Sequence, residues 1–125
     1  MSSAPRIYQL MVLTAWADGK VQPGEALAVQ KIAATEPGLA GLGNRGELAR
    51  ATRESINRQG VEAAIREAAS AIADRADREL AFRCCARVLH ADGDLAAEDA
   101  EALATLQEVF DFSSADVQRL LSQLD

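Results

Sequence analysis

The chain has 125 residues and a mass of 13.3 kDa, the usual size of a single domain with one hydrophobic core. Its 26 alanines outnumber the 16 valine, isoleucine and threonine residues together, and this balance favours helices over strands. A net charge of −6 and an aromatic content of 4% argue against nucleic-acid binding, which needs cations and stacking rings. We therefore expect one helical domain over residues 1–125.

Hydrophobic periodicity predicts seven helices and no strand, which makes the fold an all-α bundle. The expected ranges are about 5–17, 23–36, 47–59, 61–72, 77–91, 96–110 and 113–124. On the second helix we expect Leu27, Ala28 and Ile32 to face the core. Residues 38–46 contain four glycines and form a loop, with Leu39 and Leu42 available to tuck inward.

Cys84 and Cys85 are adjacent on the apolar side of the fifth predicted helix. Neighbouring helical residues point about 100° apart, so we expect two free, buried thiols rather than a disulfide. Free thiols suit the cytoplasm.

The apolar residues 7–16 imitate part of a signal peptide, but Gln9 interrupts the run and no stretch reaches the roughly 20 residues of a membrane span. We expect a cytoplasmic chain with no membrane insertion.

The acidic charge is concentrated in the last third of the chain. Residues 88–125 carry nine acids against Arg119 alone, whereas residues 45–87 carry nine arginines against seven acids. The acidic region is expected to attract cations or a basic partner surface. In the arginine-rich middle, acids interleave with the arginines, and this pattern favours a salt-bridged, solvated surface over a phosphate-binding one.

An internal repeat relates residues 17–26 to residues 91–100, at an offset of 74. Both copies read Ala-Asp-Gly, any residue, an apolar residue, three more residues and then an acid. Each copy ends one amphipathic helix and begins another, so the glycines fit a left-handed helix stop and the final acids fall in a first helical turn. The repeat predicts two pseudo-twofold-related halves within one bundle.

Asp18 and Asp92 are harder to explain, because a carboxylate at the C-terminal end of a helix meets the unfavourable end of the helix dipole. One interpretation is that each Asp caps the helix that follows. The other is that the motif acids hold a divalent cation, with Ca²⁺ or Mg²⁺ suited to such oxygen ligands. The candidate ligands are Asp18, Glu25, Asp92, Asp94, Glu98 and Asp99.

The order and spacing of these features resemble the tellurite-resistance TerB family over residues 7–124. The features are the two Ala-Asp-Gly turns, the Pro-Gly-Leu-Ala-Gly-Leu loop at 37–42, the Gly-Val-Glu-Ala-Ala-Ile start at 60–65 and residues 87–99. The resemblance implies a compact seven-helix domain with an acidic surface and metal association. It also implies a module with protein partners, such as a membrane-associated stress-response complex, and a relation to the N-terminal region of a membrane-anchored DnaJ-like co-chaperone.

The resemblance places the family's motif acids on the same six candidate ligands. Lys20 and Gly24 stand in the first copy where Asp94 and Glu98 stand in the second, which puts a symmetric pair of sites in doubt. The alternatives are a metal-independent protein-interaction domain and a thiol-dependent, tellurite-responsive protein.

No catalytic motif accompanies these features. The single histidine, His90, closes the fifth predicted helix, where a protonated imidazole is stabilised without any chemistry. Ser113 is placed to cap the last helix, and no nucleophile elbow, phosphate loop or zinc-binding helix motif occurs. The sequence predicts a non-enzymatic binding module.

Overall fold

A computed structural model describes residues 3–16, 23–39, 42–91 and 97–124. This part of the chain holds seven α-helices, one short 3₁₀ helix and no strand, so the predicted all-α bundle is confirmed. The helices are α1 (Ala4–Ala15), α2 (Pro23–Thr35), η1 (Pro37–Leu39), α3 (Arg45–Gln59), α4 (Val61–Ser70), α5 (Arg75–Leu89), α6 (Ala97–Phe110) and α7 (Ser114–Leu121).

Local sequence fixes several of the helix ends. Asn44 caps α3, since its side chain accepts a hydrogen bond from the Glu47 N–H at 3.1 Å. Ser113 caps α7 as expected and forms a full capping box with Asp116. Gly60 both ends α3 and begins α4 with φ at 87°, a conformation that disfavours a residue with a Cβ atom.

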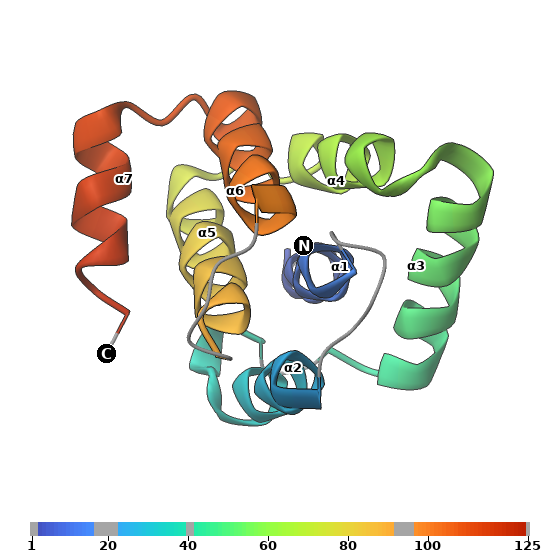
Figure 1. Cartoon of the computed structure of the whole chain (residues 1–125). Coiled ribbons are helices and arrows are strands. Elements are labelled where there is room, and N and C mark those ends of the chain that lie inside the picture. The colour runs from blue at the N-terminus through green and yellow to red at the C-terminus, as the bar shows by residue number, and fades with distance from the viewer. Residues whose placement is uncertain (1–2, 17–22, 40–41, 92–96, 125) are drawn as a thin grey trace.

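Helix α1 is the centre of the bundle. Figure 1 shows it end-on, surrounded by α2, α3, α4, α5 and α6. Most of its residues are buried, including Tyr8 and Met11. The polar Thr14 is also fully buried, and its hydroxyl donates to the Met11 carbonyl at 2.9 Å. Burial on nearly all sides explains why this helix is apolar around much of its circumference.

The structure corrects the predicted orientation of α2. Its buried face runs through Glu25, Val29, Ile32 and Ala33, whereas Leu27 is 72% exposed. Leu27 precedes Val29 by two residues, which is about 200° around the helix, so the two side chains point to opposite sides. The expectation that Leu27 faces the core is therefore wrong, while burial of Ile32 is confirmed. Leu39 is also buried as predicted, but within the short helix η1 rather than in irregular loop.

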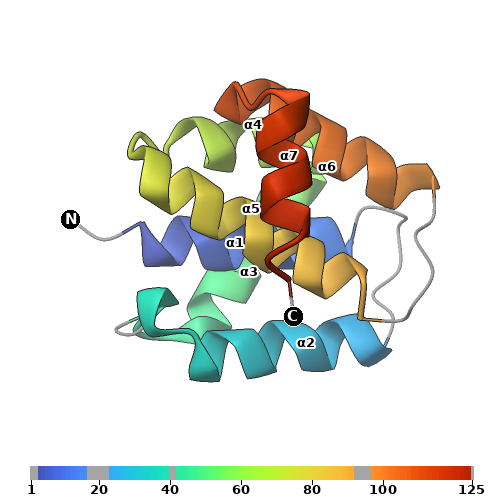
Figure 2. The same ribbon diagram turned by 90° about the vertical axis from the view of Figure 1, so that its left-hand side faces the viewer.

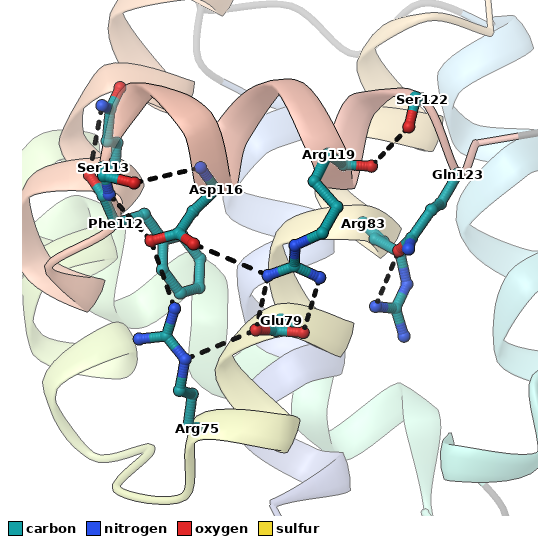
Figure 3. A network of polar contacts seen from close by, with 10 residues as sticks. Arg75, Glu79, Arg83, Phe112, Ser113, Asp116, Arg119, Ser122 and Gln123 are labelled. Atoms are coloured by element: carbon teal, nitrogen blue, oxygen red, sulfur yellow. Dashed lines mark hydrogen bonds and ion pairs between the residues drawn. The ribbon is translucent and has the colours of Figure 1, made fainter.

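Helix α7 is held on α5 by apolar and ionic contacts. Leu120 is fully buried, and Phe112, just before α7, packs edge-on against Phe82 of α5 with ring centroids 5.7 Å apart. Figure 3 shows the ionic cluster on the surface of this interface, where Glu79 of α5 lies between two arginines. Arg119 Nη2 is 2.9 Å from Glu79 Oε2, and Arg75 Nε is 3.4 Å from the same oxygen.

Candidate functional site

The two Ala-Asp-Gly motifs connect helices whose ends lie on the same side of the bundle. The first motif lies between α1 and α2, and the second lies between α5 and α6. In Figure 2, the ends of α1 and α5 and the starts of α2 and α6 all lie on the right-hand side of the molecule. Helix α5 also packs against both α1 and α2. The helix ends that flank the two copies of the repeat therefore lie on the same side of the bundle, although the copies are far apart in sequence.

The predicted ligands themselves are only partly described. Glu25 lies in the first turn of α2, as the repeat predicts. Glu98 and Asp99 lie in the first turn of α6, and their side chains are outside the described part of the structure. Three further candidates fall wholly outside the described residues: Asp18, Asp92 and Asp94.

Glu25 faces inward. Only 3% of the residue is exposed, and it continues the apolar face formed by Val29 and Ile32. Burial of a carboxylate is costly unless a positive charge or hydrogen-bond donors compensate it, and the N-terminal end of a helix supplies part of that compensation. Glu25 is thus an inward-facing acid at the start of α2, on the side of the bundle where the helix ends that flank both motifs lie.

Within the described residues, no three His, Cys, Asp or Glu side chains lie close enough together to hold a metal ion. The donor chemistry of the motif acids suits a hard cation, because all six candidates are carboxylates. Their arrangement around a cation remains a prediction.

The sequence model of the family described as tellurite resistance protein TerB matches residues 5–122, nearly the whole chain. The chain belongs to the TerB family. It is accordingly a helical module of a family associated with tellurite resistance, and that family is generally not catalytic. No curated protein and no solved structure matches the sequence of this chain significantly.

The cysteines of this TerB domain are core residues. Cys84 is 1% exposed and Cys85 is fully buried. Burial raises the pKa of Cys84 to about 12, and burial also raises the pKa of Cys85. The thiolate is the reactive form, so both thiols are poor nucleophiles at neutral pH. These observations confirm core packing and remove support from a thiol-dependent reaction with tellurite.

His90 lies at the end of α5. It is exposed and is the C-cap of α5, where its backbone N–H donates to the Ala86 carbonyl at 3.0 Å. The described side chains around it include no partner that would orient the imidazole for proton transfer. Within the described residues, nothing gives this histidine a catalytic environment.

Part of the arginine-rich middle of the TerB domain is salt-bridged, as its sequence predicts. Arg66 lies 3.2 Å from Glu108 and 3.9 Å from Glu62. Hydrogen bonding to Glu108 is the main reason that the pKa of Arg66 is raised. Arg87 similarly lies 3.7 Å from Glu36.

No helix within the described residues is long and apolar enough to cross a membrane.

Proposed function

We propose that this TerB-family chain is a non-enzymatic binding module in which the acids of both Ala-Asp-Gly motifs together hold one divalent cation, Ca²⁺ or Mg²⁺. The observation that carries the proposal is that the four helix ends that flank the motifs lie on the same side of the bundle (Figure 2). Because those ends share one side of the bundle, short loops extending from them can bring acids from both motifs to one place.

Charge and burial support the same proposal. Residues 88–125 carry a net charge of −8, so a group of motif acids there repels itself unless a cation neutralises it. Glu25 adds an inward-facing carboxylate from the other motif. Lys20 and Gly24 make the first motif the poorer ligand set, which favours one shared site over two symmetric sites.

The bound cation serves recognition in this proposal. An acidic surface with a partly coordinated cation can bind carboxylates or carbonyls of a partner directly, or a basic surface through the remaining acids. We propose a cytoplasmic module that recruits protein partners in tellurite or stress resistance, including membrane-associated ones, and does not bind nucleic acid. Metal-independent protein binding is the second candidate, and the substitution of Lys20 for an acid in the first motif favours it.

Calorimetric titration with Ca²⁺, Mg²⁺, Mn²⁺ and Zn²⁺ tests the proposal. The unmodified protein and Asp92→Asn/Asp94→Asn are compared, with Asp111→Asn/Glu54→Gln as a control that neutralises two exposed acids outside the motifs. We expect one binding event, and a higher melting temperature with cation, in the unmodified protein and the control but not in the motif variant. The absence of heat and of any stabilisation at millimolar cation would leave only the metal-independent candidate.

A further inference from the structure

A groove of about 270 Å³ lies between α1, α2 and α3, and its lining includes Trp16 and Ala26, which precede and end the first copy of the repeat. Helix α1 supplies Tyr8 and Val12, and Trp16 follows at its C-terminal end. The two side walls carry alanines, Ala26 on α2 and Ala49 on α3. The short alanine side chains leave space that larger residues would fill, so the groove follows directly from the sequence of its walls.

Hydrogen bonds between the three helices hold one part of the groove in place. The Gln30 amide on α2 donates to the Tyr8 hydroxyl on α1 at 3.2 Å. Arg45 on α3 in turn donates to the Gln30 side-chain oxygen at 3.3 Å. This chain of contacts links α1, α2 and α3, and it places one guanidinium group beside the apolar floor.

The charge of the groove is opposite to that of the whole chain. The described residues that line it include no acid, although the protein has a net charge of −6. Arg53 lines the groove, is exposed, and makes no ion pair or hydrogen bond within the described part of the chain. An exposed cation beside apolar surface can bind a carboxylate with little competition from the protein's own acids.

A second groove on this protein differs because the charge of one of its arginines is balanced by a neighbouring acid. The groove between α1, α3 and α4 has a similar volume, about 220 Å³, but two acids line it, Glu54 and Glu67. There Arg58 lies 3.9 Å from Glu67, so its charge is already balanced. Because Arg53 has no such partner among the described residues, the groove between α2 and α3 is the better place for an acidic ligand.

We infer that the groove between α1, α2 and α3 binds an acidic segment of a partner protein that inserts one bulky apolar side chain beside Trp16 and pairs a carboxylate with Arg53. The volume is slightly below the 300–1,000 Å³ that is common for small-molecule sites, and it suits a single large side chain. Neither Trp16 nor Arg53 is one of the six proposed cation ligands.

Trp16 makes the inference directly testable, because it is the only tryptophan of the chain and lines the groove. The probe is a tryptophan-free helical peptide with one phenylalanine flanked by glutamates. It is compared with a glutamate-to-glutamine peptide, a phenylalanine-to-alanine peptide and octanoate. We expect the acidic phenylalanine peptide to change Trp16 fluorescence in a saturable way and the two altered peptides to bind at least tenfold more weakly.

Variants of α3 complete the experiment. Arg53→Gln should weaken binding of the acidic peptide about tenfold, whereas Arg50→Gln, the same change at an exposed position outside the groove, should not. Ala49→Leu fills the groove and should abolish binding without removing charge. Equal binding of the glutamine peptide, equal affinity of Arg53→Gln, or binding of octanoate but of no peptide would overturn the inference. Loss of the cation response in calorimetry would leave these results unchanged.

Discussion

Replacing Glu79 by glutamine removes the central charge of the cluster that joins α5 to α7 (Figure 3). Both oxygens of Glu79 accept hydrogen bonds from Arg119, at 3.4 and 2.9 Å. Arg75 approaches the same carboxylate and also lies 3.2 Å from Asp116 of α7. Glutamine keeps the size of the side chain but offers one neutral oxygen, so the variant tests the charge with little change in packing.

The expected loss of stability is about 1 kcal/mol. Exposed ion pairs contribute about 0.2–1 kcal/mol each, and bidentate arginine geometry within a network lies at the upper end of that range. The side chain of Glu79 is only 20% exposed, so solvent screens it less than it screens the arginines. For a domain of this size, about 1 kcal/mol corresponds to a fall of roughly 4 °C in melting temperature.

The pH dependence gives a second readout with a defined sign. The hydrogen bond from Arg119 is the main cause that lowers the pKa of Glu79 below its ordinary value. A carboxylate with a lowered folded-state pKa stabilises the protein above its unfolded pKa, and this contribution is lost as the pH falls through the folded pKa. The loss of stability between neutral pH and about pH 3 should therefore be smaller for Glu79→Gln than for the unmodified protein.

Thermal unfolding at several pH values measures both effects. Glu54→Gln is the control, since Glu54 is exposed and makes no ion pair among the described residues; its effect should stay within about 0.5 kcal/mol. In a double-mutant cycle, Glu79→Gln should cost less in an Arg119→Gln background than in the unmodified protein. A Glu79→Gln variant with unchanged melting temperature and unchanged acid sensitivity would refute the assigned role of the cluster.

The burial of side chains and the backbone geometry lead to three further predictions, on helix α2, on the two cysteines and on Gly60. Leu27→Gln should change the free energy of unfolding by less than about 0.5 kcal/mol, whereas Ile32→Ala, on the buried face of the same helix, should cost about 2–5 kcal/mol in denaturant unfolding. Cys84 and Cys85 should react with an aromatic disulfide reagent only as fast as the protein opens, and both should react at once in guanidinium chloride; rapid labelling of the native protein would contradict their burial. Gly60→Ala should lower stability by about 1–2 kcal/mol because φ is 87° at that position, and an unchanged melting temperature would show that the α3–α4 junction adapts.

Periodicity was sufficient to predict the helices because each one buries a stripe against its neighbours. Helices α2, α3, α4 and α5 pack on α1, whereas α6 packs on α4 and α5, and α7 packs on α5. Periodicity failed at α2, where small alanines occur on every side and the acid Glu25 occupies an inward position. A pattern search that treats every acid as exposed assigns the wrong face to such a helix. The predicted start of α5 was also two residues late, since Asp74 caps it through the Asp77 N–H.

The contacts between helices could not be predicted from the sequence. The Arg119–Glu79 pair joins residues 40 positions apart, and the groove at Trp16 depends on how α2 and α3 pack on α1. Neither feature has a local pattern that could reveal it. The six motif acids come from the sequence, and their convergence around a cation stays a prediction. The structure adds that the flanking helix ends lie on one side of the bundle (Figure 2).

Broadening of backbone amide NMR signals by substoichiometric Mn²⁺ tests the shared cation site most directly, because a paramagnetic ion broadens signals only in its vicinity. If both motifs share one cation, we expect simultaneous broadening at the start of α2, around Glu25, and at the flanks of the second motif, around Ala91 and Ala100. We expect the signals to recover when Mg²⁺ is added in excess. Broadening at one motif alone, or spread evenly over exposed acids such as Glu108 and Asp111, would contradict a site built from both motifs.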